Sequence, residues 1–149
     1  MKVQSNPSTP VCPVTRASIR AEVTAAFDEA VRVCESGDAT FALFETQLFV
    51  LMATLGRCLI RLFLTARLKR LELKPFLQDG KYRRGDDYAE RTLKTFYGDV
   101  PYGRQYLMSQ DGGSGIFPLD VVLGLTRDRL SPWVMQWVAR LVVGDAHEF

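Results

Sequence analysis

The sequence predicts a mainly α-helical protein that carries one small β-hairpin, a fold of the α+β class. Apolar residues recur at helical spacing through residues 18–75, and two short runs of alternating side chains meet at a turn near Gly98. The chain has 149 residues, of which 47% are hydrophobic and 24% charged, so it can bury a core. Residues 1–17 are polar and proline-rich, lack the apolar core of a signal peptide, and predict a disordered arm.

The helical region spans residues 18–75, and its first predicted helix covers residues 18–35. Gly37 follows this helix, at a position where a left-handed residue often ends a helix. Asp38 or Thr40 can then cap a second helix by accepting a hydrogen bond from its free backbone N–H groups.

The second helix is long: it begins at Phe41 and Pro75 ends its pattern, and the two helices form an N-terminal pair. Its apolar residues alternate steps of three and four, which is the pattern of a coiled-coil-like seam. The first helix can cover part of this apolar surface. The remainder indicates either a homodimer with this seam as its interface or a missing downstream region. The residues assigned to the interface are Phe41, Phe44, Leu48, Leu51, Leu55 and Leu62.

The apolar stretch at residues 48–64 approaches the length of a membrane span, but it contains Arg57 and Arg61. Each arginine would cost about 2.5–3.5 kcal/mol near the centre of a bilayer. We therefore expect no membrane insertion and a cytoplasmic protein. Cys34 and Cys58 lie on the apolar faces of the two helices, which predicts buried free thiols in a reducing compartment.

Residues 76–149 hold a hairpin and short helices, and we interpret this region as a candidate DNA-binding module. Residues 77–90 are polar and turn-rich, which predicts a linker. A two-stranded antiparallel hairpin follows, with strands over about 91–97 and 100–106 and a turn at Gly98–Asp99. Two short helices complete the chain as a helical hairpin or a helix-turn-helix, one over Pro118–Leu125 and one from Ser131–Pro132 to Gly144.

The charge is unevenly distributed although the net charge is only +2. Residues 57–104 contain 12 Lys and Arg against 6 Asp and Glu, which favours a surface that faces a polyanion. Basic side chains alternate here with tyrosines, and the alternative interpretation is that the tyrosines anchor a small core while the cations are merely solvated. The candidate DNA-binding residues are Arg83, Arg84, Arg91, Lys94 and Arg104.

The residue pattern does not favour catalysis. The single histidine, His147, lies near the C-terminus without a partner to orient it, and no serine or cysteine has a histidine close in sequence. No metal-ligand spacing occurs, so we expect neither a metal nor another cofactor. Asp120 begins a short predicted helix, where a carboxylate would cap the helix or compensate its dipole. We expect this chain alone not to be an enzyme.

Three motifs follow one another at short spacing. Residues 91–106 fit R-x-x-x-T-x-x-G-x-V-x-x-x-R-x-Y, residues 118–125 fit P-L-D-x-x-L-G-L, and Ser131–Pro132 opens a helix. In this order they resemble the N-terminal part of bacterial insertion-sequence transposases of the ISKra type, over about residues 91–141. The resemblance implies recognition of transposon DNA ends by this region. It also implies that a downstream metal-dependent domain, beginning beyond residue 149, catalyses DNA transposition, so no catalytic residue is carried over.

Two functional hypotheses follow from the residues and the resemblance. The first is the DNA-binding N-terminal region of a transposase, acting in DNA recombination and non-catalytic by itself. The second is a dimerising regulatory fragment, or an inert remnant, of a decayed mobile element. Binding to duplex DNA separates the first hypothesis from the second.

Overall fold

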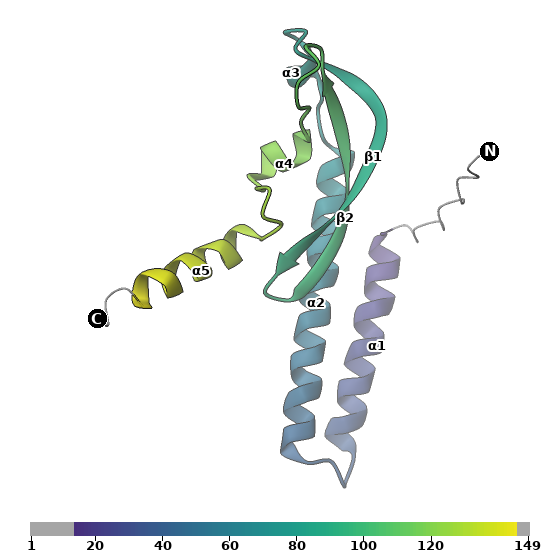
Figure 1. The fold of residues 1–149 in the computed structure, drawn as a ribbon. Helices are drawn as coiled ribbons and strands as arrows, with labels where there is room; N and C mark the ends of the chain where they lie inside the picture. Colours follow the sequence, from purple (N-terminus) through teal and green to yellow (C-terminus); the bar gives the residue numbers. More distant parts are fainter. Residues whose placement is uncertain (1–13, 146–149) are drawn as a thin grey trace, which may run out of the picture.

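The computed structural model describes residues 14–145, leaving aside the side chains at 86–87 and 144–145, so most of the predicted arm at residues 1–17 lies outside the described residues. The elements are α1 (Arg16–Glu35), α2 (Phe41–Lys69), α3 (Lys74–Leu77), β1 (Tyr82–Thr95), β2 (Gly98–Ser109), α4 (Pro118–Leu123) and α5 (Pro132–Asp145). The predicted α+β class is confirmed, with one long helix, a helical pair and a two-stranded antiparallel sheet (Figure 1).

Helices α1 and α2 form the expected N-terminal pair and lie side by side from the beginning of α2 to beyond its middle, where Arg61 of α2 pairs with Glu22 of α1 (Figure 1). A threonine caps each helix: Thr15 Oγ1 accepts from the backbone N–H of Ser18, and Thr40 Oγ1 accepts from Leu43. Helix α1 turns Val33 into the interface, and the neighbouring Cys34 consequently faces solvent. The prediction that Cys34 is buried is therefore wrong, whereas Cys58 is fully buried.

The hairpin is longer than the sequence predicts. The polar stretch interpreted as a linker at residues 77–90 belongs to β1 from Tyr82 onward, where it pairs with the end of β2 across a bulge between Arg84 and Tyr88. The predicted turn is also displaced, because Phe96 and Tyr97 form the turn and Gly98 already pairs with Thr95. Gly98 has φ 109°, a conformation that glycine adopts readily, so it opens β2 rather than the turn.

The hairpin lies across the second half of α2, and its tip is fixed to the middle of that helix (Figure 1). Gly56 permits the contact, since a Cβ atom there would come within 2.2 Å of the ring Cγ of Tyr97. The Arg57 guanidinium donates a 2.7 Å hydrogen bond to the Tyr97 carbonyl oxygen. Farther from the tip, toward the end of α2, a buried core joins α2, both strands and α4. It consists of Leu64, Leu93, Val100, Tyr102 and Leu119.

Helix α4 packs on β2, whereas α5 projects from the rest of the molecule (Figure 1). The first half of α5 is held by aromatic contacts at the hairpin tip, where the Phe96 ring lies 4.6 Å from Trp133 and 5.9 Å from Trp137 between centroids. The segment before α5 also pairs with β1: the Lys94 N–H donates to the Arg129 carbonyl oxygen at 2.7 Å, and the Ser131 N–H donates to Lys94 at 2.9 Å.

Much of α2 remains exposed. Of the residues predicted to form the dimer seam, Phe41 and Leu48 are exposed, while Phe44, Leu51, Leu55 and Leu62 are half-buried within this chain. By length and composition, α2 is the one helix among the described residues that could cross a membrane, with a mean hydropathy of 1.8 over 18 residues of which 17% are buried. A core helix can pass the same test, so the expected absence of membrane insertion stays a prediction.

Candidate nucleic-acid interface

A group of basic residues gathers where α2 ends and β1 begins. Between residues 67 and 84 the chain carries seven Lys and Arg against two acids, Glu72 and Asp79. All seven are exposed, and none forms an ion pair with a described side chain. We call this group the basic end, and it consists of Arg67, Lys69, Arg70, Lys74, Lys81, Arg83 and Arg84.

A tight connection brings these residues together. Helix α2 ends at Lys69, Leu73 is buried, and the short α3 begins with proline in its first turn. Gly80 then adopts φ 71° and Asp79 Oδ1 accepts from the Lys81 N–H at 3.2 Å, which directs the chain into β1. As a result, the end of α2, α3 and the start of β1 lie at one end of the molecule (Figure 1).

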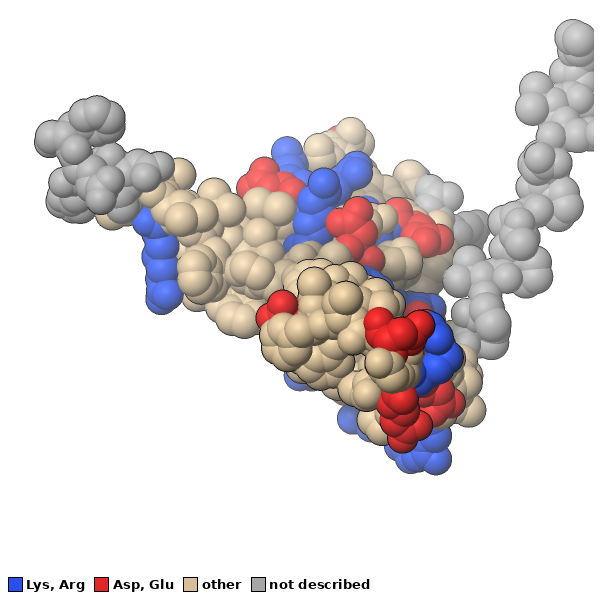
Figure 2. All heavy atoms as spheres, turned by 90° about the horizontal axis from the view of Figure 1, so that it is seen from below, with Lys and Arg blue, Asp and Glu red and all other residues tan. Residues whose placement is uncertain are grey.

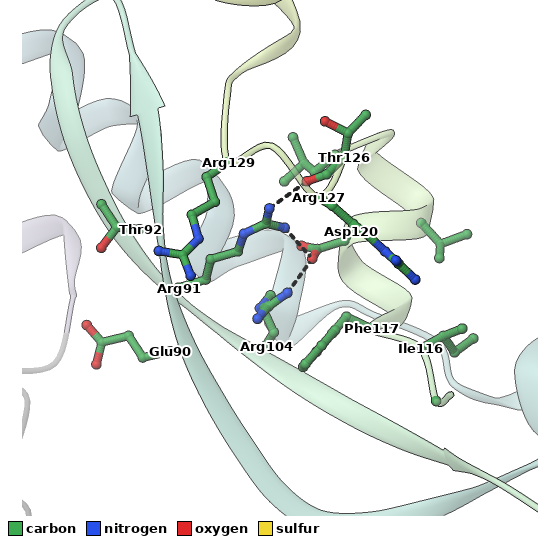
Figure 3. A pocket seen from close by; sticks show the side chains of 13 residues that line it. Glu90, Arg91, Thr92, Arg104, Ile116, Phe117, Asp120, Thr126, Arg127 and Arg129 are labelled. Carbon is green, nitrogen blue, oxygen red and sulfur yellow. Dashed lines mark hydrogen bonds and ion pairs between the residues drawn. The ribbon is translucent and has the colours of Figure 1, made fainter. Parts of the chain in front are cut away.

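A second set of charged side chains is buried between the hairpin and α4. Asp120 Oδ2 accepts from Arg91 Nη1 at 3.1 Å and from Arg104 Nη1 at 2.6 Å, while its Oδ1 accepts from the Tyr102 hydroxyl at 2.7 Å. Arg91 also donates to the Thr126 carbonyl oxygen at 2.6 Å (Figure 3). We call Arg91, Tyr102, Arg104 and Asp120 the Asp120 cluster.

The Asp120 cluster changes the interpretation of three predicted residues. Asp120 lies in the first turn of α4, but its carboxylate makes no capping hydrogen bond and is instead directed at the two arginines. The side chains of Arg91 and Arg104 are only 8% and 12% exposed, so their guanidinium groups are committed within the protein. Their ion pairs hold α4 against both strands of the hairpin.

Tyr102 contributes the neutral donor of the Asp120 cluster. Its side chain is buried, and this burial, followed by the hydrogen bond to the Asp120 carboxylate, raises the pKa of Tyr102 to about 12. The hydroxyl therefore remains protonated and donating at neutral pH. Tyr102 is a core anchor, in agreement with the alternative interpretation of the tyrosines.

The sequence predicts that the five candidate DNA-binding residues converge on one patch, and this prediction is wrong. Arg83 and Arg84 are exposed within the basic end, whereas Lys94 is exposed near the hairpin turn. Ten residues of extended strand between Arg84 and Lys94 correspond to about 30 Å. Arg91 and Arg104 lie between these positions, in the Asp120 cluster.

The structure adds two basic residues that sequence reasoning missed. Arg127 and Arg129 are exposed, belong to the loop after α4, and line an open cleft of about 730 Å³ together with the two arginines of the Asp120 cluster (Figure 3). We call this feature the arginine cleft. The signal in the sequence is "TRDR" at residues 126–129. It begins 22 residues after Arg104 and 35 after Arg91, and it gives no indication that it folds back onto them.

Comparison with protein-family models, curated proteins and solved structures finds no match to this chain. Among the described residues, no group of three or more His, Cys, Asp or Glu side chains could hold a metal ion. The exposed charged side chains of the basic end, and those of Arg127 and Arg129 in the arginine cleft, are cations.

Proposed function

We propose that this protein is a DNA-binding module that contacts the phosphate backbone through its basic end. The observation that carries the proposal is the set of seven exposed cations, without described ion-pair partners, against two acids in 18 residues. Lysine and arginine that neutralise phosphates release condensed counterions, which makes such a surface favourable for nucleic acid at low salt. Phosphate contacts of this kind position a protein on DNA without reading its sequence.

We further propose that the module acts as the N-terminal region of a transposase of the ISKra type and recognises transposon ends without catalysing strand transfer. The motifs behind this resemblance have a physical connection, because Arg91 and Arg104 of the hairpin motif bind Asp120 of the P-L-D motif. Their joint occurrence is what a folding unit that docks α4 on a hairpin requires. In this proposal the Asp120 cluster is scaffold, and Arg83 and Arg84 contact DNA.

The test is binding of the whole chain to a fluorescently labelled duplex at fixed low salt. The variant Arg83→Ala/Arg84→Ala removes two cations of the basic end, and we expect its affinity to fall by about tenfold or more, since charge-assisted contacts to phosphate are strong. The matched control is Arg16→Ala/Arg20→Ala, which removes two exposed cations of α1. Equal affinities of the two double variants would remove the basic end from the proposal.

A second candidate role, self-association, is favoured by a stripe of exposed apolar side chains along α2. Their spacing of seven and four residues places them on one face of the helix, and the stripe consists of Phe41, Leu48, Met52, Leu59 and Phe63. Figure 2 shows that the molecule carries mostly uncharged surface near the beginning of α2 and over α5. Glu45 and Arg67 lie near opposite ends of the stripe. In an antiparallel dimer, Glu45 of each copy would therefore lie opposite Arg67 of the other copy, which gives two ion pairs.

Sedimentation tests this role. We expect the weight-average mass to rise with protein concentration, and the variant Leu48→Lys/Met52→Lys to remain a monomer because it buries two charges in the interface. The interface predicted from the sequence shares Phe41 and Leu48 with this stripe. A wild-type mass that stays at the monomer value at all concentrations would exclude both versions of the dimer.

A further inference from the structure

The arginine cleft contains more positive charge than its acids neutralise. Its lining includes four arginines, at positions 91, 104, 127 and 129, against Glu90 and Asp120. Asp120 already forms ion pairs with Arg91 and Arg104, the two buried arginines. Arg127 and Arg129 form no ion pair or side-chain hydrogen bond with a described residue.

Arg104, one of the arginines that line the cleft, has a nitrogen without a hydrogen-bond partner in the described part of the chain. The Nε atom of Arg104 is buried and has no hydrogen-bond partner among the described residues. Its guanidinium lies 3.6 Å from the centroid of the Phe117 ring, which forms part of the cleft wall (Figure 3). The wall therefore combines an arginine that is held by Asp120 with an aromatic ring that stacks on it.

The loop that carries the two free arginines is held at both ends. Thr126 accepts from Arg91 through its carbonyl oxygen, and the Arg129 carbonyl accepts from the Lys94 N–H of β1. Arg129 adopts φ 59°, the one positive φ of a non-glycine residue among the described residues. A conformation of this kind persists where the surrounding structure fixes it, and it often occurs at binding sites.

We propose that the arginine cleft binds a phosphate group of a nucleotide, with Arg127 and Arg129 as its charged ligands. Guanidinium groups match phosphate oxygens through paired N–H donors, which makes arginine the side chain most suited to this ligand. A cleft of about 730 Å³ is within the range of small-molecule sites, so it has room for the sugar and base attached to the phosphate. The cleft lies outside the basic end, and this inference does not rest on DNA binding there.

Isothermal titration of the whole chain, at constant ionic strength set with sodium chloride, tests the inference. The probes are inorganic phosphate, dAMP and adenosine. We expect phosphate and dAMP to bind with one site per chain and adenosine not to bind. Binding of adenosine as tight as that of dAMP would overturn phosphate recognition, and absence of binding by phosphate and dAMP would overturn the site.

The variant Arg127→Gln/Arg129→Gln locates the site, and we expect it to weaken dAMP binding at least tenfold. Arg16→Gln/Arg20→Gln is the matched control, because it removes two exposed cations of α1, outside both the cleft and the basic end, and it should bind dAMP as the wild type does. Circular dichroism checks folding; if the glutamine variant unfolds, Arg127→Gln alone replaces it, with the same expectation of clear weakening. Unchanged dAMP affinity in a folded variant contradicts the inference, while duplex binding by the basic end would stand unaffected.

Discussion

Asp120 receives hydrogen bonds from three side chains, two of them guanidinium groups with little exposure to solvent. Replacing it by alanine would leave two buried positive charges without a partner. We expect Asp120→Ala to lower the free energy of unfolding by about 3–5 kcal/mol, measured by urea denaturation. Asp128→Ala removes an exposed acid nearby and should change stability by less than about 0.5 kcal/mol. Similar losses in the two variants would show that the Asp120 cluster does not hold α4 on the hairpin.

The raised pKa of Tyr102 predicts that the protein loses stability at alkaline pH. Its pKa in the folded protein is about 12, above the ordinary value of 10. The unfolded chain therefore loses this proton first, so the contribution is fully present below pH 10 and is lost as the pH rises through 12. The loss amounts to about 2 kcal/mol. Denaturation at pH 9 and pH 12 measures it, and Tyr102→Phe should show a smaller decrease between these values than the wild type.

At the scale of elements, the contact between the hairpin tip and α2 depends on the missing side chain of Gly56. A methyl group there would overlap the first ring carbon of Tyr97, which cannot move away without displacing the turn. We expect Gly56→Ala to destabilise the protein by about 1–3 kcal/mol. Gly37→Ala is the control, because no described atom lies within 4 Å of a Cβ atom placed there. Equal unfolding midpoints for the two variants would contradict this packing.

The elements differ in how much of them the sequence predicts. Helices α1 and α2 are long and periodic, so their apolar spacing and the Thr40 cap locate them within a few residues. The first half of β1 carries polar side chains and a bulge, so it lacks the alternation that marks a strand. The sequence misplaces the hairpin turn because a glycine usually marks a turn. In the structure, the positive φ of Gly98 belongs to the first residue of β2.

The candidate site was predictable only in part. Arg83 and Arg84 belong to a local run of cations, which composition reveals directly. The pairing of Arg91 and Arg104 with Asp120 spans 29 and 16 residues, and such contacts arise from the docking of α4 on the hairpin. Arg127 reaches the cleft for the same reason, so residue type alone could not separate scaffold arginines from free ones.

At the scale of the whole molecule, α2 packs against two partners: α1 along its N-terminal part and the hairpin along its C-terminal part. Two arginines of its apolar stretch take part in these contacts, Arg57 with the Tyr97 carbonyl and Arg61 with Glu22 at 3.0 Å. Insertion of α2 into a bilayer would break both. We therefore expect the protein to stay in the supernatant when sedimented with neutral phosphatidylcholine vesicles, and co-sedimentation would contradict this expectation.

We propose that DNA binds at one end of the molecule, where the cations of α2, α3 and β1 meet. The most direct measurement is the salt dependence of duplex binding by the whole chain, as the slope of log K against log salt concentration. If five to seven of the basic-end cations contact phosphates, the slope is about −4.5 to −6, and Arg83→Ala/Arg84→Ala reduces its magnitude by about 2. No binding at low salt, or a slope near zero, would contradict DNA binding by the basic end.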